Sequence, residues 1–323
     1  MTMTEEQARR FADLFDRLVA GVETVLVGKN HVIRLSFTAL LSRGHLLLED
    51  VPGTGKTSLA RAMAQSVGGT SHRVQFTPDL LPGDITGVSI FDQRSGRFEF
   101  HPGPVFANIV LADEINRASP KTQSALLEVM EEGRVTVDGV SHPMPSTFMV
   151  IATQNPVEQA GTYRLPEAQL DRFLMRTSIG YPDHAAMMRI LSEAEFRGEE
   201  TTVPAVASAE LIARMSALAR TAHVEPAIHD YVARLIEASR NAEEVRLGAS
   251  VRAGLGLLRS AKTFAAASGR HYVVPDDVKT LAGPVLAHRI ILDAEAEFDG
   301  ATPEAVIDSL LLETEPPGWG QAA

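Results

Sequence analysis

One stretch of the chain has the residue types that bind a polyphosphate. It follows an apolar run at residues 46–48 and leads into a helical pattern after residue 58. Its glycines let backbone N–H groups converge on phosphate oxygens, and the N-terminus of the following helix adds partial positive charge. This strand–turn–helix context predicts a nucleoside triphosphate site rather than a chance glycine turn. The residues expected to hold the nucleotide are Val51, Pro52, Gly53, Thr54, Gly55, Lys56, Thr57 and Ser58.

Two of these side chains have distinct expected roles. Lys56 should reach the β- and γ-phosphates, and the Thr57 hydroxyl should bind Mg²⁺. The stretch departs from the usual G-x-x-x-x-G-K-[ST] pattern, because Asp50 stands where the first glycine is expected. The turn is still feasible, since Pro52 fixes its φ angle and Gly53 tolerates a positive φ. The effect of Asp50 on the loop is open at this stage.

An acidic pair ends a later apolar run. Residues 109–112 suit a parallel strand that is buried on both faces, and Asp113 and Glu114 follow at its carboxyl end. Ligands bind at that end of open α/β sheets. We therefore expect Asp113 to hold the Mg²⁺ shell and Glu114 to orient and activate the attacking water. Most Asp-Glu pairs are solvated surface, and it is the position downstream of the phosphate-binding stretch that favours this role.

A third polar residue, Asn155, follows the apolar run at 148–153. An amide at the end of a strand is often only a turn residue. Because the phosphate-binding stretch and the acidic pair are also present, we favour a water-positioning role for Asn155.

Alternating strands and helices are expected to position these residues. Thr4 and Gln7 form a capping-box pattern at the start of a helix over residues 4–25, and residues 70–76 look like a strand. Two hairpins are predicted, one pairing residues 88–91 with 97–100 and one turning at Asp138-Gly139. The first hairpin either has only a structural role or forms a surface that binds a partner.

The pattern changes after Tyr181-Pro182. Helical spacing dominates from there, with one weak strand candidate at residues 271–274. We expect an α/β domain over residues 1–182, a helical domain over 183–313 and a loose tail over 314–323. The helical segments lie near residues 185–196, 208–222, 226–240, 249–268, 275–289 and 303–313.

The composition excludes several classes of protein. With 323 residues, 45% apolar and 22% charged, the chain is long enough for two domains and is neither disordered nor membrane-spanning. It has no cysteine, so disulfides and thiolate chemistry are excluded. The acidic N-terminus does not resemble a secretory signal, and we expect a cytoplasmic protein. The net charge of −11 disfavours non-specific binding to nucleic acid.

The order of these landmarks resembles that of AAA+ ATPases, and the linking segments resemble the MoxR family. The similarity runs from about Val27 to about Arg289, and it is far more specific than a lone phosphate loop. The segments that carry it are residues 75–82, 112–118, 152–156 and 165–173.

This resemblance implies a fold and a set of roles. The fold is an αβα core with a five-stranded parallel sheet in the order 5-1-4-3-2, two inserted β-hairpins and a helical lid. Asn155 matches the first sensor residue, Arg172 matches the arginine finger given in trans to a neighbouring subunit, and Arg252 matches the second sensor in the lid. Arg117 is a third arginine candidate near the subunit boundary. The four residues that match the Walker motifs are Lys56, Thr57, Asp113 and Glu114.

The resemblance also implies that the protein hydrolyses ATP. Its cofactors are ATP and Mg²⁺, with the adenine expected near Gly28 and the lid. The active form is expected to be a ring, a hexamer, that remodels or matures a protein client together with a separate von Willebrand factor A domain protein. A magnesium-chelatase-like motor subunit is a close relative that differs mainly in its partner.

Two alternatives from other classes stay open. A nucleic-acid translocase would need basic hairpin tips, but acidic neighbours offset Arg94, Arg97 and Arg134. A nucleotide-gated scaffold with little turnover is disfavoured by the presence of Glu114, Asn155 and Arg172.

Overall fold

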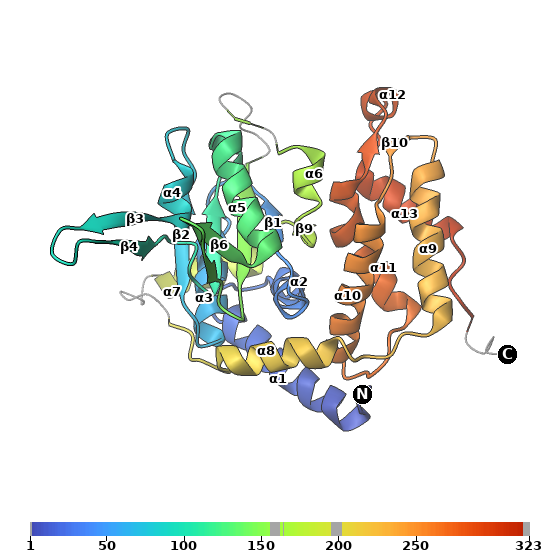
Figure 1. The fold of residues 1–323 in the computed structure, drawn as a ribbon. Coiled ribbons are helices and arrows are strands. Elements are labelled where there is room, and N and C mark those ends of the chain that lie inside the picture. Colours follow the sequence, from blue (N-terminus) through green and yellow to red (C-terminus); the bar gives the residue numbers. More distant parts are fainter. Residues whose placement is uncertain (1, 156–161, 164, 195–201, 319–323) are drawn as a thin grey trace.

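A five-stranded parallel sheet forms the centre of the first half of the chain (Figure 1). The computed structural model describes residues 2–155, 162–163, 165–194 and 202–318. The strand order is β2-β5-β8-β1-β9, which is the expected 5-1-4-3-2 order when these five strands are counted along the chain. The strands are β1 (Leu46–Glu49), β2 (Ser71–Gln75), β5 (Ile109–Asp113), β8 (Met149–Gln154) and β9 (Met175–Thr177).

Helices cover both faces of this sheet, as the apolar strands require. Successive residues of β1 alternate between two cores: Leu46 and Leu48 face one, and Leu47 faces the other. The first core contains α1 (Glu5–Glu23), α2 (Asn30–Leu41) and α3 (Lys56–Ser66), and the second contains α5 (Pro120–Glu132). The capping box of Thr4 and Gln7 begins α1 as expected.

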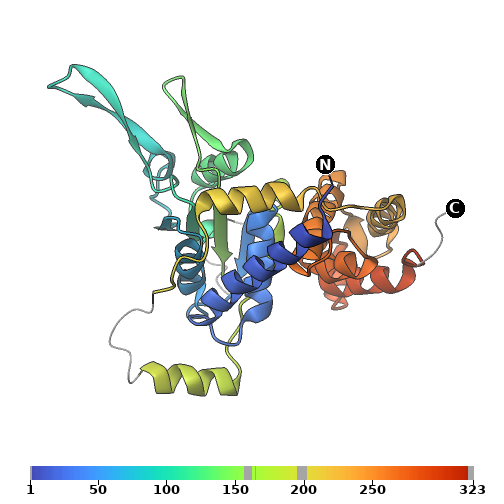
Figure 2. The same ribbon diagram turned by 90° about the horizontal axis from the view of Figure 1, so that it is seen from below.

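Both predicted hairpins are present. After α4 (Pro82–Thr86), the first pairs β3 (Gly87–Asp92) with β4 (Arg97–Pro102), and the second pairs β6 (Arg134–Val137) with β7 (Val140–Pro143). Asp138 and Gly139 both have positive φ, 51° and 78°, as a tight two-residue hairpin turn needs. Figure 2 shows the two hairpins leaving the body on the same side.

The second half of the chain is mostly helical, as expected. It adds a two-stranded ribbon of β10 (Val245–Leu247) and β11 (Ile291–Leu292), which the sequence did not indicate. The strand candidate at residues 271–274 contributes only an isolated bridge between His223 and Tyr272. The helices are α7 (His184–Ala194), α8 (Ala209–Ala219), α9 (Pro226–Asn241), α10 (Val251–Ala267), α11 (Pro275–Leu286), α12 (Ala294–Phe298) and α13 (Pro303–Glu313).

Contacts between the two halves are extensive. The apolar core around α1 and α2 continues into α10 and α11 without a break. Helix α8 lies across the α/β half, where the Thr147 hydroxyl donates a hydrogen bond to the Ala209 carbonyl (2.8 Å). None of the helices that the structure describes is both long enough and apolar enough to cross a bilayer.

Candidate ATP site

The phosphate loop connects β1 to α3 through backbone conformations that need glycine. Gly53 and Gly55 have φ angles of 84° and 97°, and Gly55 is the N-cap of α3. A Cβ on Gly55 would also lie 2.7 Å from Leu26 Cδ1, so the loop packs closely under the residues before α2. The Lys56 ammonium donates hydrogen bonds to the carbonyls of Asp50 (3.2 Å) and Val51 (2.9 Å). The loop therefore presents the helix N-terminus and a lysine at the carboxyl end of β1.

Asp113 lies at the end of β5, where only 8% of it is exposed. Its Oδ2 accepts from Arg73 Nη2 (2.6 Å), and its Oδ1 accepts from the Thr153 hydroxyl (2.6 Å). The same hydroxyl accepts the N–H of Glu114 (2.8 Å). One buried threonine of β8 thus fixes both members of the acidic pair.

Glu114 has a left-handed backbone, with φ 56° and ψ 50°. Such a strained backbone conformation is often found at functional sites. Its Oε2 accepts from the Gln75 amide (2.7 Å) and lies 3.2 Å from Arg117 Nη1. Arg117, the third arginine candidate, therefore pairs within its own subunit in this structure.

Asn155 completes this edge of the sheet. It follows β8, which lies between β1 and β5, so it stands between the phosphate loop and Asp113. Neighbouring strands are about 4.8 Å apart, which separates the loop from the acidic pair by about 10 Å. That spacing accommodates a triphosphate with its metal and a water.

The residues at this edge fit a magnesium ion. A hydroxyl and a carboxylate are the hard oxygen ligands that Mg²⁺ takes in such sites, with the remaining positions filled by phosphates and water. Thr57 lies in the first turn of α3 on one side of Asn155, and Asp113 ends β5 on the other. The described residues contain no cluster of three or more His, Cys, Asp or Glu that would indicate a dedicated metal centre. When the metal binds, the Asp113 carboxylate would give up its contact with Arg73 and contact the metal instead.

Gly28 lies beside the start of the helical half. Its φ is 72°, and a Cβ there would lie 3.2 Å from Ala186 in α7. The expected adenine neighbourhood is therefore where the segment before α2 meets α7.

Arg172 and Arg252 lie at the opposite end of the sheet. Arg172 precedes β9 and shares a cavity of about 480 Å³ with residues 43–45, which precede β1. Because β1 and β9 are parallel, this is the amino end of both strands. Glu131 of α5 bridges the two arginines, at 3.2 Å from Arg172 Nη2 and 3.1 Å from Arg252 Nη2.

This cavity, which we call the arginine pocket, is strongly basic. Five arginines and two carboxylates line it. Asp171 pairs with Arg289 (2.6 Å). In the described parts of the chain, no carboxylate pairs with Arg43 or Arg259. Withdrawal from solvent is the main cause that lowers the pKa of Arg259, and repulsion from Arg289 and Arg252 lowers it further.

Sequence reasoning missed several residues that hold these groups. Gln75, Thr153 and Glu131 each contact a predicted site residue across the fold. The polar residues that end β2 and β8 were available as a signal, because the ends of parallel strands meet at one edge. Nothing in the local pattern around Glu131 indicates its partners.

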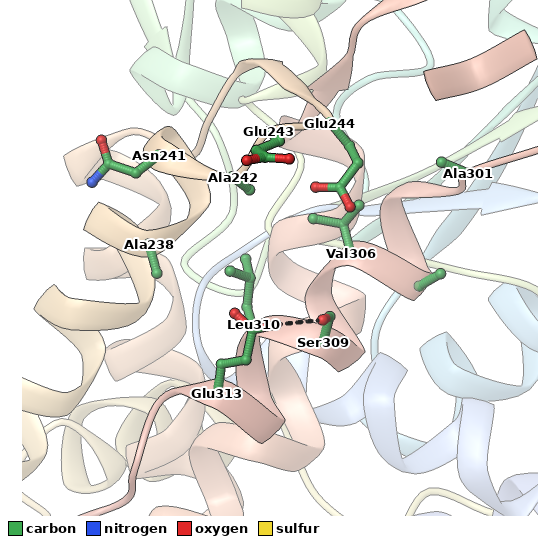
Figure 3. Close-up of a pocket in the computed structure, with 11 residues that line it drawn as sticks. Ala238, Asn241, Ala242, Glu243, Glu244, Ala301, Val306, Ser309, Leu310 and Glu313 are labelled. Atoms are coloured by element: carbon green, nitrogen blue, oxygen red, sulfur yellow. Dashed lines mark hydrogen bonds between the residues drawn. The ribbon is translucent and has the colours of Figure 1, made fainter. Parts of the chain in front are cut away.

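A second cavity, of about 530 Å³, lies in the helical half between α9 and α13 (Figure 3). Its floor is apolar, and Glu243, Glu244 and Glu313 carry its charge. No predicted site residue lines it, and its acidic rim would repel a nucleotide. It is not the candidate ATP site.

A phosphate loop between β1 and α3, an acidic pair after β5, the 5-1-4-3-2 sheet and a helical lid define an AAA+ ATPase. Residues 45–175 match the family described as "ATPase family associated with various cellular activities (AAA)", and residues 237–310 match the AAA lid domain.

Individual relatives narrow the class. The chain is 43% identical to the chaperone MoxR1 of Mycobacterium tuberculosis, over 92% of this chain and 80% of the relative. It is 46% identical to the uncharacterized protein YeaC of Bacillus subtilis, over 94% and 95%. A crystal structure from Cytophaga hutchinsonii superposes with a TM-score of 0.91 at 36% identity, over 97% of this chain and 98% of that one. The chain belongs to the MoxR family of AAA+ ATPases and is an ATP hydrolase of that class.

Proposed function

We propose that this protein is a Mg²⁺-dependent ring ATPase whose active sites form between subunits, and that it remodels or matures a protein client. One observation carries the proposal. The phosphate loop and the acidic pair lie at one end of the sheet, and the arginine pocket lies at the other end. A head-to-tail contact between copies would bring the two ends together, and repeating it closes a ring.

The expected division of labour follows from the chemistry of phosphoryl transfer. Lys56 and the helix N-terminus bind the β- and γ-phosphates, while Glu114 and Asn155 position the attacking water. Thr57 and Asp113 would hold Mg²⁺, which would supply positive charge to the phosphates when it is bound. Charge that develops on the γ-phosphate also needs an arginine, and Arg172 of a neighbouring copy supplies it.

Arg252 acts in the same place in this proposal. It shares Glu131 with Arg172, and the pocket that holds both lies at the amino end of the strands. A cis role beside the phosphate loop of its own subunit would require it to cross the length of β1, about 13 Å at 3.3 Å per residue. The arrangement therefore favours a trans role for both arginines.

The first hairpin is the proposed client contact. Val88, Ile90, Phe91 and Phe98 are at least 46% exposed, although such side chains are usually buried. The Phe91 and Phe98 rings contact each other edge to face, at 5.3 Å between centroids. An apolar arm of this kind suits a protein client better than a nucleic acid, which would need basic residues there.

Three parts of the proposal rest on the family resemblance. They are a six-membered ring, a separate von Willebrand factor A domain protein as partner, and residues 183–313 as a lid that moves with the nucleotide state. A cytoplasmic location agrees with the absence of cysteine from the sequence.

The test is the specific ATPase activity measured against protein concentration. Ring assembly predicts that activity per subunit rises with concentration in the wild type and stays low in Arg172→Ala. A low, flat rate in the wild type, despite tight ATP binding, would instead indicate a nucleotide-gated scaffold. Stimulation by DNA would indicate a translocase.

A further inference from the structure

Asp50 replaces the first glycine of the phosphate-loop pattern, and the structure shows what its carboxylate does. Asp50 is 5% exposed. Its Oδ2 accepts the backbone N–H of Ile179 (2.6 Å), and its Oδ1 accepts that of Gly180 (2.9 Å). Both oxygens of a buried charge are thus satisfied by two consecutive backbone donors, which is a strong and directional arrangement.

The segment that Asp50 holds leads from the last sheet strand to α7. Gly180 has a φ of 65°, a conformation that presents consecutive N–H groups to one acceptor. The Lys29 ammonium fixes the next residue by donating to the Tyr181 carbonyl (2.7 Å). Asp183 then caps the first turn of α7 by accepting the Ala186 N–H (2.7 Å).

The first turn of α7 returns to the nucleotide region. Ala186 is 5% exposed and packs against Gly28. Asp50 therefore connects the phosphate end of the candidate site with the segment beside its expected adenine end.

We propose that Asp50 is a positioning residue: its carboxylate ties the phosphate loop to residues 179–180 and so couples phosphate binding to the placement of α7. The inference rests on the proposed nucleotide site. Lys56 bonds the Asp50 and Val51 carbonyls from the other side of the loop. A triphosphate competes for that ammonium, and the resulting shift of the loop is passed to α7 through the Asp50 side chain.

The substitution Asp50→Asn distinguishes a positioning role from one in which the carboxylate only repels phosphate, because the two roles predict opposite changes in Mg·ADP affinity. Asp50→Asn keeps the size of the side chain, but it removes the charge and places an amide donor against a backbone donor. If the carboxylate only repelled phosphate, its loss would tighten the binding of Mg·ADP. If it positions the loop, affinity for Mg·ADP falls about tenfold, the loss expected for a charge-assisted hydrogen bond. Affinity for AMP, which lacks the β-phosphate, stays within about twofold because AMP does not use the Lys56 end of the loop.

The experiment combines calorimetry with hydrogen exchange on the full chain. Variants are Asp50→Asn and Asp50→Gly, with Asp13→Asn on the exposed side of α1 as a charge-matched control. In nucleotide-free protein, exchange at residues 179–180 should accelerate at least tenfold in both Asp50 variants and remain unchanged in the control. In wild type, Mg·ADP should slow exchange across residues 179–186, and Asp50→Asn should lose that protection.

Three results would overturn the proposal. They are unchanged exchange at residues 179–180, tighter Mg·ADP binding by Asp50→Asn, and an equal loss of ADP and AMP with faster exchange throughout the chain. Failure of the wild type to bind Mg·ADP would contradict the nucleotide site itself, and the nucleotide-free exchange would still test the tether. If Asp50→Asn does not fold, Asp50→Gly decides the outcome.

Discussion

At the carboxyl end of the central sheet, Asp113 and Glu114 are each bonded to groups of their own subunit. At the amino end, the arginine pocket has more positive charge than its two carboxylates neutralise. The carboxyl end resembles a hydrolytic site without its arginine finger. The arginine pocket at the amino end resembles a site that would bind an anion such as a phosphate. Strands of one parallel sheet separate the two ends, so in the proposed ring each end is completed by a second copy.

In the proposed ring, this difference between the two ends would make hydrolysis depend on assembly. A parallel sheet collects ligand-binding residues at one edge, so a group at the other edge reaches the ligand only from a second molecule. Substitutions that disturb one end and leave the other intact separate the contributions of the two ends.

Arg172→Ala should have the largest effect. Removing an arginine finger costs about 10³-fold or more in turnover. We expect Mg·ATP affinity to stay within a fewfold of the wild type, because the phosphate loop is unchanged. Steady-state ATPase at ring-forming concentrations measures the first quantity and calorimetry the second. Normal turnover would mean that Arg172 is not the finger.

Glu114→Gln disturbs the other end. An amide cannot accept the proton of the attacking water, so kcat should fall about 10²-fold or more while ATP still binds. Glu128→Gln on the exposed side of α5 is the matched control and should retain full activity. Single-turnover hydrolysis separates the chemical step from binding. A Glu114→Gln variant with full turnover would contradict its role as the base.

Arg252→Met should have a smaller effect, about tenfold in turnover, because Arg172 remains in the arginine pocket. Arg246→Met, at an exposed arginine of β10, removes the same charge from the helical half and should change little. Combined with Arg172→Ala, Arg252→Met should cost less than it does alone, since the two arginines share Glu131 and act on one charge. Strict additivity in a double-mutant cycle would show that they act separately.

The smallest effect is expected from the contribution of Arg259 to the pKa of His45, which lines the arginine pocket. Burial lowers the pKa of His45 to about 4; the Met130 carbonyl opposes this, and Arg259 contributes to it. The folded pKa lies below the unfolded value of 6.5, so stability is complete above pH 6.5 and falls as the pH drops towards 4. The loss from His45 is about 3 kcal/mol over that range. Burial also lowers the pKa of His288, which adds to the loss.

Replacing Arg259 removes the electrostatic part of this shift. Arg259→Met should recover only a few tenths of a kcal/mol near pH 5, because burial is the larger cause. Urea unfolding of the wild type and Arg259→Met at pH 7, 6 and 5 measures the difference. Stability that does not change between pH 7 and 5 would contradict the buried, neutral state of His45.

The local sequence pattern was enough to predict which residues meet at the carboxyl end of the sheet, but not which residues meet at the amino end. Lys56, Asp113 and Asn155 each lie at or after the carboxyl end of a strand, and these ends share one edge in a parallel sheet, so their proximity was predictable. The place of Arg252 was not, because its partner Glu131 is 121 positions away and belongs to the other half of the chain. Its role could be assigned only by resemblance.

Asp50 shows the same limit within the most recognisable motif. Its presence in the phosphate loop was evident, but its two donors lie 129 and 130 positions further along the chain. The β10–β11 ribbon was missed for a related reason, since strands of three and two residues are too short to show an alternating pattern.

The most direct test of the proposed trans site mixes two variants that are each expected to be inactive. Glu114→Gln keeps the arginine pocket and loses the proposed catalytic base, whereas Arg172→Ala keeps that base and loses the proposed finger. In a random equimolar ring, about a quarter of the interfaces would join an intact base to an intact finger. The mixture should therefore hydrolyse ATP well above the sum of its components. A rate equal to that sum, with mixed rings demonstrated by mass, would contradict an active site shared between subunits.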